Sequence, residues 1–165
     1  MSALAALMVT ACGTASTLPL WRDPGFAPAA VHRVFVVATV PKPLLSVQFE
    51  NALASALAGK GFQVATASAA VPPGSSREQV AAYITENHVD LVVDERLTFI
   101  SQGPYYASPG YATAETSVYA GSAYGENPVW TAVTTAKNYT SVQEAAASLA
   151  ASIVDGLLRA GILVR

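Results

Sequence analysis

Charged residues, cysteine and histidine are all scarce in this sequence of 165 residues. Only 12% of the residues are charged and 52% are hydrophobic, which excludes a chain kept disordered by high charge and low hydrophobicity. The basic residues nowhere form a cluster and the formal net charge is −2, so no nucleic-acid partner is expected. The single cysteine excludes a disulfide framework and a cysteine-rich zinc site. No apolar run approaches the roughly 18 to 20 residues that a membrane-spanning helix needs.

Several patterns that carry enzymatic chemistry are also missing. The Gly-x-Ser-x-Gly turn of many serine hydrolases does not occur. Gly59 and Gly61 follow a predicted helix instead of preceding one, and Gly74 lacks the lysine of a phosphate-binding loop. We therefore expect no nucleotide, no metal and no other cofactor. The sequence favours a non-enzymatic protein, with a small hydrolase as the weaker alternative.

Two groups of titratable residues could still form a site. His32 lies at the start of one predicted strand and His88 just before a strand predicted to neighbour it, although open α/β sheets bind ligands at the carboxyl ends of their strands. Asp94 and Arg96 share one face of a predicted strand, while Glu95 points to the apolar face, where a carboxyl group can have a raised pKa. We favour a structural interpretation, with an Asp94–Arg96 pair on a partly solvated face and Glu95 near the edge of the sheet.

The apolar pattern predicts a single α/β domain over residues 31–165. Residues 31–40 form a nearly continuous β-branched run, typical of a strand that is buried on both faces. The predicted order is β-α-β-α-β-β-β-α, with strands over residues 31–40, 62–68, 90–100, 112–120 and 129–137, and with helices that start near Pro43, at a Ser75/Glu78 capping box and at a Ser141/Glu144 capping box. Two early crossovers predict a parallel core, extended antiparallel by the later strands. The expected architecture is one mixed sheet of about five strands with helices packed on it.

The first residues resemble an export signal. Val9, Thr10, Ala11 and Cys12 resemble the lipobox of bacterial lipoproteins, in which small residues precede a cysteine that takes a diacylglyceryl group. The resemblance implies a signal peptide over residues 1–11 and a membrane anchor of several acyl chains at Cys12. Gly13 in place of an acidic residue implies the outer membrane, facing the periplasm. The alternative is an ordinary amino-terminal helix with Cys12 as a buried thiol.

The segment between the predicted signal peptide and the α/β domain has a composition unlike that of either. Residues 12–30 contain Pro19, Pro24 and Pro28 among small polar residues, so we expect the acylated cysteine to be followed by an extended tether. Trp21 and Phe26 are too apolar for a bare linker and should pack back onto the domain.

Three segments of the domain carry a further resemblance. Residues 31–38, 49–65 and 88–97, followed by a Tyr/Gly/Pro segment, Pro-Val-Trp and an Ala-rich helix, resemble a group of small proteobacterial lipoproteins of unknown function. The layout is also similar to the amino-terminal α/β domain of TolB and to the lipoprotein activators of penicillin-binding proteins. These segments consist of core and turn residues, so the resemblance implies a fold and says little about function.

The segment of residues 101–125 holds five of the seven tyrosines, spaced by Gly, Ser, Ala and Pro. Tyrosine buries a large area at low entropic cost and keeps a hydrogen-bonding tip, which suits contact with a protein or a glycan. We predict that Tyr105, Tyr106 and Tyr111 contact another envelope protein. The alternative is a loop whose tyrosines cover the sheet edge, in a structural or stress-related surface lipoprotein that has no dedicated ligand.

Overall fold

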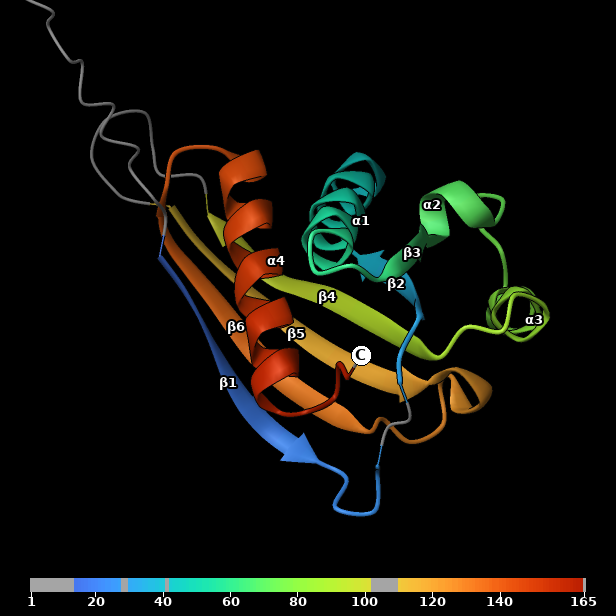
Figure 1. The fold of residues 1–165 in the computed structure, drawn as a ribbon. Helices are drawn as coiled ribbons and strands as arrows, with labels where there is room; N and C mark the ends of the chain where they lie inside the picture. Colours follow the sequence, from blue (N-terminus) through green and yellow to red (C-terminus); the bar gives the residue numbers. More distant parts are fainter. Residues whose placement is uncertain (1–13, 28–29, 41, 102–109, 165) are drawn as a thin grey trace, which may run out of the picture.

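One mixed sheet of six strands organises the protein, seen in a computed structural model that describes residues 14–27, 30–40, 42–101 and 110–164. The strand order across the sheet is β1-β6-β5-β4-β2-β3 (Figure 1). β2 runs parallel to β3 and β4, and the remaining neighbours are antiparallel, as the sequence predicts. The strands are β1 (Thr14–Arg22), β2 (Arg33–Thr39), β3 (Gln63–Thr66), β4 (Leu91–Ser101), β5 (Gly110–Ala120) and β6 (Trp130–Tyr139).

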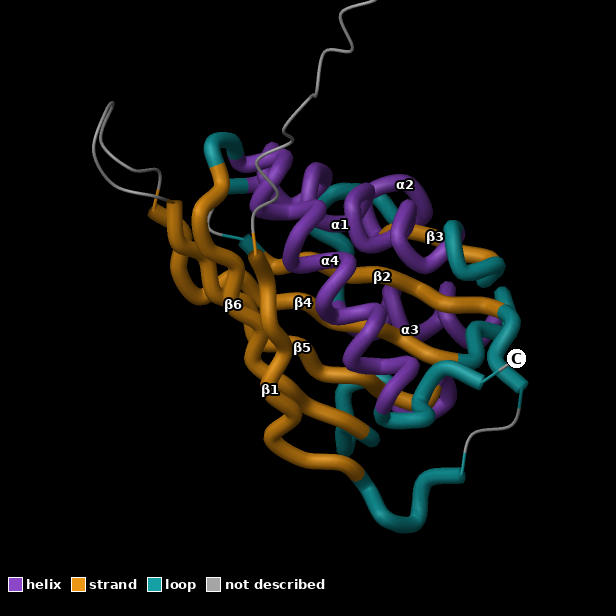
Figure 2. The backbone as a smooth tube through the Cα atoms, turned by 60° about the vertical axis from the view of Figure 1, so that its left-hand side comes forward, coloured by secondary structure: helices purple, strands orange, loops and turns teal. Residues whose placement is uncertain are grey.

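Helices cover both faces of the sheet, but unequally. α1 (Pro43–Ala58) and α4 (Val142–Arg159) lie side by side on one face, and α3 (Arg77–Glu86) packs on the other (Figures 1 and 2). The short helix α2 (Ala67–Ala70) follows β3, and a 3-10 turn, η1 (Gly121–Ala123), follows β5. Within the described ranges, every helix is too short or too polar to cross a membrane.

The core lies mainly between the sheet and the α1/α4 layer. Alternate residues of each strand point to this layer, and the predicted apolar positions of both helices meet them. A smaller cluster on the opposite face joins α3 to the sheet through Phe35, Ile84 and Val92. The large side chains buried between the sheet and these two helices include Val34, Val36, Phe49, Leu53, Leu57, Val93, Trp130, Leu149, Ile153 and Leu157.

β1 differs from the predicted order of elements. Where the sequence predicts a tether, Thr14–Arg22 pairs antiparallel with β6, which makes six strands instead of about five. Thr17 fixes the strand beneath α4, because its hydroxyl is 2.9 Å from those of both Thr134 and Ser152. Pro19 does not prevent pairing, because β1 is an edge strand and one of its sides needs no donor. The proline content correctly indicated that this segment is extended, but it did not indicate that the segment pairs with a strand of the sheet.

The two aromatic residues of the supposed tether behave differently. Phe26 packs against the main core, as predicted. Trp21 is instead 46% exposed, because it follows a β-bulge between Pro19 and itself and stands opposite Thr131, on the face away from α4.

A second bulge changes the predicted face of one residue of β4. The sequence places Phe99 on the same face as Leu91, Val93 and Leu97. The register shifts between Leu97 and Phe99, so that Leu97 is buried under the helices whereas Phe99 turns to the opposite face and is 52% exposed. One extra residue in a strand reverses the alternation beyond it, which the residue pattern alone did not reveal.

The amino-terminal cap of α3 lies one residue beyond its predicted position. Ser76, and not Ser75, is the N-cap, and it forms a capping box with Gln79 instead of Glu78. The Ser75 hydroxyl donates to the Pro72 carbonyl instead. At the second predicted box, Ser141 caps α4 as expected, while the Glu144 carboxylate accepts from the backbone and hydroxyl of Thr140.

This cap gives a simple test of the structure. Ser76→Ala is expected to lower the free energy of unfolding by about 1 kcal/mol, because it leaves an amide of the first turn without its acceptor. Ser75→Ala, the matched control, should cost less, because its hydroxyl bonds only to an exposed turn carbonyl. Urea unfolding of both variants measures the difference. A larger loss from Ser75→Ala would contradict the assigned cap.

Candidate interaction surface

The sheet face opposite α1 and α4 is only partly covered. α3 lies over β2 and the first half of β4, where Tyr119 and Tyr124 also join its cluster. Beyond it, no described helix covers the outward side chains of β1, β6, the first part of β5 and the last part of β4 (Figures 1 and 2). We call this region the open face. Its outward residues are Leu18, Trp21, Arg96, Phe99, Tyr111, Thr113, Glu115, Thr131, Val133, Thr135 and Lys137.

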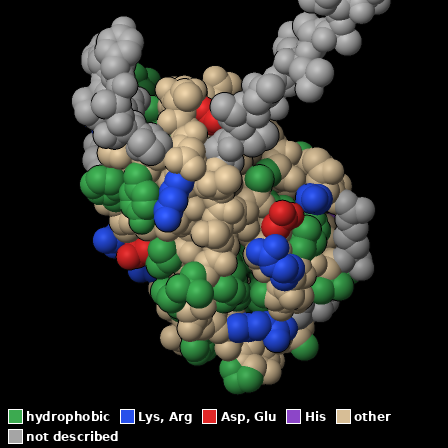
Figure 3. All heavy atoms as spheres, turned by 90° about the vertical axis from the view of Figure 1, so that its left-hand side faces the viewer, with side chains coloured by type: hydrophobic (Ala, Val, Ile, Leu, Met, Phe, Trp, Pro, Cys, Tyr) green, Lys and Arg blue, Asp and Glu red, His purple; other side chains and the backbone are tan. Residues whose placement is uncertain are grey.

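Three apolar side chains of β1 project into solvent at the margin of the open face. Leu18, Leu20 and Trp21 are 65%, 61% and 46% exposed. Leu18 pairs with Val133 in the register of β1 and β6, which extends the apolar surface inward. Figure 3 looks at the molecule from the side where β1 lies, and hydrophobic side chains gather there among basic ones. Large apolar side chains grouped on an edge strand are typical of a protein contact.

The other aromatic group of the open face lies where β4 ends and β5 begins. The rings of Phe99 and Tyr111 meet edge to face, with centroids 5.9 Å apart, and the Lys137 ammonium lies 5.9 Å from the Tyr111 ring. Hydrogen bonds with the side chains of Thr113 and Thr135 lower the pKa of Tyr111, and the Lys137 charge adds to this. Tyr111 is 39% exposed, and its ring contacts both Phe99 and Lys137, as the side chain of a contact surface should.

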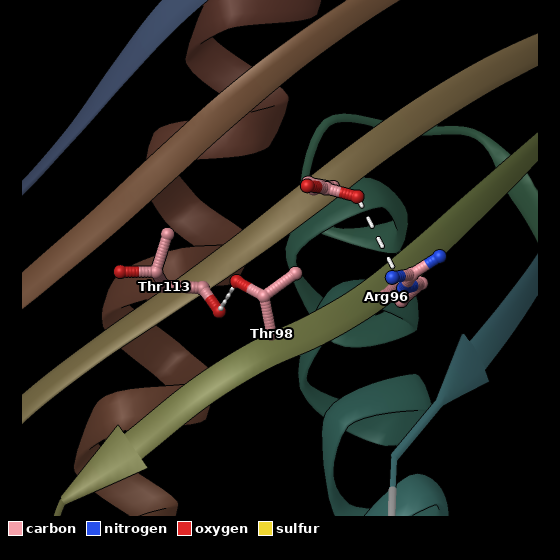
Figure 4. A network of polar contacts seen from close by, with 4 residues as sticks. Arg96, Thr98 and Thr113 are labelled. Atoms are coloured by element: carbon pink, nitrogen blue, oxygen red, sulfur yellow. Dashed lines mark hydrogen bonds and ion pairs between the residues drawn. The ribbon is translucent and has the colours of Figure 1, made fainter.

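The charged residues between these two groups make few strong interactions. In Figure 4 the guanidinium of Arg96 points to the carboxylate of Glu115 on β5, 4.0 Å away, while the Thr98 hydroxyl donates to the Thr113 carbonyl (3.0 Å). Both charged side chains are more than half exposed, so the pair contributes little stability. Arg96 thus pairs with Glu115, whereas the sequence suggested Asp94. Burial raises the pKa of Asp94, and the positive charges of Arg77 and Arg96 partly oppose this.

Glu95 lies in the centre of the sheet and not near its edge, which corrects the sequence-based interpretation. It sits on β4 between β2 and β5, on the face under the helices, and is 1% exposed. Its two carboxylate oxygens and the hydroxyl of its neighbour Thr116 have no hydrogen-bond partner among the described residues. Burial raises the pKa of Glu95 to about 8, and the charge of Asp94 contributes to this. The side chain is thus neutral at pH 7 and sealed from any substrate.

The remaining predicted residues lie apart from this surface or outside the described ranges. His32 and His88 are both exposed, and Asp90 near them accepts hydrogen bonds from the backbone amides of His32 and Arg33. No group of three or more His, Cys, Asp or Glu side chains in the described part of the chain could hold a metal. Tyr105, Tyr106 and Cys12 lie outside the described residues. Tyr111 alone of the predicted contacts is placed, on the open face.

Leu18 and Leu20 were missed as candidate contacts, because their segment was interpreted as a tether. The signal was present in the sequence: Leu-Pro-Leu-Trp is too apolar for a linker and too rich in proline for a core strand. That combination is typical of an edge strand.

Comparison with known proteins supports the fold. No protein-family model matches the chain, and no curated protein is detectably related to it. Two structures of the PelC dodecamer from Paraburkholderia phytofirmans, one of them a single-residue variant, superpose with a TM-score of 0.63 at 16% and 14% identity. They cover 88% and 93% of this chain and 97% and 99% of theirs. Lipoprotein GNA1162 from Neisseria meningitidis has a TM-score of 0.47 at 12% identity, over 78% of this chain and 96% of its own.

The likeness to PelC supports the class of fold and no more. An α/β domain with one mixed sheet is common to this chain and PelC at an identity too low to transfer a function. The expected similarity to TolB and to the activators of penicillin-binding proteins stays a prediction.

Proposed function

We propose that this chain is a lipid-anchored bacterial envelope lipoprotein whose α/β domain is a non-enzymatic binding module for another envelope protein. The proposal includes acylation at Cys12 and a position on the outer membrane, facing the periplasm. The observation that carries it is the group of exposed apolar side chains on β1, namely Leu18, Leu20 and Trp21, beside the open face.

β1 offers a partner two kinds of contact. Among the described strands it pairs only with β6, so no described strand covers the backbone amide and carbonyl groups of its outer edge. Residues 14–21 contain no charged side chain, the usual protection of an exposed edge, and only Pro19 and the bulge interrupt them. An extended segment of another protein could add to this edge while its side chains bury Leu18 and Trp21.

Self-association is a second candidate function, favoured by a separate observation. The two similar PelC structures are described as dodecamers. A free edge with apolar side chains could bind a second copy of this chain as readily as a different protein. Both candidates place the contact on β1 and the open face, so one experiment can distinguish them.

Photo-crosslinking in intact cells tests the proposal. A photoreactive residue at Leu20 is expected to give one discrete adduct, and probes at Tyr106 and Tyr111 test the other predicted contacts. The matched control is a probe at Ala58, which is exposed at the end of α1, the helix that packs on β2 and β3 at the other edge of the sheet. An adduct of twice the chain mass would identify a second copy as the partner. Leu18→Lys should weaken the adduct at least tenfold, because burying one such side chain is worth about 1.5–3 kcal/mol.

Two outcomes would contradict the proposal in different ways. If no probe gives an adduct while the protein remains in the membrane fraction, the binding role is wrong and a structural role is favoured. If the protein leaves the membrane fraction under mild washing and carries no acyl mass, the lipid anchor is wrong.

A further inference from the structure

The first residue of β1 is almost adjacent to the cysteine of the lipobox. Only Gly13 separates Cys12 from Thr14. An extended chain advances at most about 3.6 Å per residue, so the Cα atoms of Cys12 and Thr14 can be no more than roughly 7 Å apart. Thr14 is held in the sheet by its pairing with Lys137. The chain therefore leaves no room for a tether between a lipid on Cys12 and the folded domain.

Several elements reach the same end of the sheet as Thr14. The register continues from Thr14 through Lys137 and Tyr111 to Ser101, so β1 and β5 begin, and β4 and β6 end, in one row. α4 starts here, directly after β6 (Figures 1 and 2). The first turn of α1 belongs here too, because Leu45 joins the core cluster of this end. We call this the anchor end. The end of α4 lies away from it (Figure 1).

The anchor end carries exposed apolar and basic side chains. Leu44, in the first turn of α1, is 83% exposed, and Phe99 and Tyr111, which are 52% and 39% exposed, project from the last part of β4 and the start of β5 in this row. Lys42 and Lys137 are exposed beside them. The acidic Glu144 is half-buried and bonded to Thr140. Aromatic and aliphatic side chains mixed with lysines are typical of the membrane–water interface, where rings and apolar stems enter the lipid and ammonium groups meet anionic headgroups.

We infer that the anchor end lies directly on the lipid headgroups, with Leu44, Phe99 and Tyr111 in the membrane interface. The inference rests on the proposed acylation of Cys12, which brings a bilayer to within about two residues of the sheet. It gives Tyr111 a lipid contact where the sequence suggested a protein contact. It also directs the strands away from the bilayer, so that Leu20 and Trp21, at the other end of β1, face a partner in solution.

Lipid, and not a second protein, is the expected occupant because of the short covalent connection. A protein partner of the anchor end would have to fit beside Thr14, whose Cα atom lies no more than roughly 7 Å along the chain from that of the lipid-bearing Cys12. A β-strand added to a sheet needs about 4.7–4.9 Å for its backbone alone, before its side chains and a second layer.

Spin labels on the acylated protein test the inference. Acylation occupies Cys12, the only cysteine of the chain, so an introduced cysteine is the single free thiol. Leu44→Cys and Phe99→Cys place a nitroxide at the anchor end, and Leu158→Cys, exposed in the last turn of α4, is the matched control. Each protein is reconstituted in vesicles of phosphatidylethanolamine and phosphatidylglycerol. The accessibility of the label to oxygen, which enters lipid, is then compared with its accessibility to a polar nickel chelate.

The expected ratio of oxygen to nickel accessibility is several-fold higher at positions 44 and 99 than at position 158. In the same chains with Cys12→Ser, the three positions should be alike. Equal ratios in protein that carries the acyl mass would overturn the membrane contact and leave the lipid anchor standing. Protein that never gains the acyl mass in the producing cell would overturn the anchor and this inference together. All three sites are exposed, so the labels should not disturb folding.

Discussion

The free energy of unfolding of the wild-type protein is expected to fall by about 4–5 kcal/mol as the pH rises from 4 to 9, and Glu95→Gln should abolish most of this fall. The pKa of Glu95 is raised from 4.5 to about 8 by burial and by Asp94. The folded state therefore holds a proton that the unfolded chain has released. This contribution to stability is complete below pH 4.5. It falls by about 1.4 kcal/mol per pH unit between pH 4.5 and 8, and it is lost once the pH has risen through 8.

Urea unfolding at half-unit steps of pH measures this effect. Asp94 has a pKa raised in the same direction, so the difference between wild type and Glu95→Gln isolates Glu95. The matched control is Glu115→Gln on the neighbouring strand, which removes an exposed carboxylate and should change the free energy of unfolding by less than about 1 kcal/mol. Glu95→Met should be more stable than wild type at pH 9, because it removes a buried charge that has no partner among the described residues. Parallel pH curves for wild type and Glu95→Gln would contradict the buried, unpaired carboxyl group.

The second large effect is expected from Trp130→Ala, which should lower the free energy of unfolding by about 3–5 kcal/mol. Trp130 begins β6 with its side chain fully buried under α4, close to Gly156. Truncation leaves a cavity that the sheet and α4 can close only partly, because both are fixed by other contacts. Urea unfolding measures the effect. The expected result is a lowered midpoint or the loss of the cooperative unfolding transition.

The chain provides its own control, because its other tryptophan is exposed on the neighbouring strand. Trp21→Ala should cost less than about 1 kcal/mol in stability, since Trp21 is 46% exposed, but should weaken the crosslink from Leu20. The two variants thus separate the core from the proposed contact surface. A small cost for Trp130→Ala, or a large cost for Trp21→Ala, would contradict the assigned positions of β1 and β6.

The helices and the central strands could be predicted from the sequence because their patterns are local. Leu45, Phe49, Leu53 and Leu57 recur at the spacing of one helix face, and the last three are buried as that spacing predicts. The β-branched run that becomes β2 was equally clear, because a strand buried on both faces tolerates few polar residues. Both crossovers, and hence the parallel core, follow from the order of these elements.

The candidate site was less predictable, because the exposure and contacts of its residues depend on a β-bulge and on strands that are far apart in the sequence. The bulge at Thr98 that turns Phe99 outward depends on the register between β4 and β5, a relation between distant segments. Tyr111 was singled out by composition, but its neighbours Thr135 and Lys137 come from a strand that lies well beyond it in the chain. Tyr105 and Tyr106 remain predictions.

The sequence by itself determined the helix faces and the buried central strands, because these depend on the periodicity of nearby residues, and it determined the parallel core, because this follows from the order of those elements. Only the tertiary structure decided that residues 14–22 form an edge strand, that Glu95 is buried in the centre of the sheet, and that Leu18, Leu20 and Trp21 are exposed together. The physical reason is the same in all three cases. A strand has no internal hydrogen bonds, so its place, register and faces are fixed by partners far away in the chain.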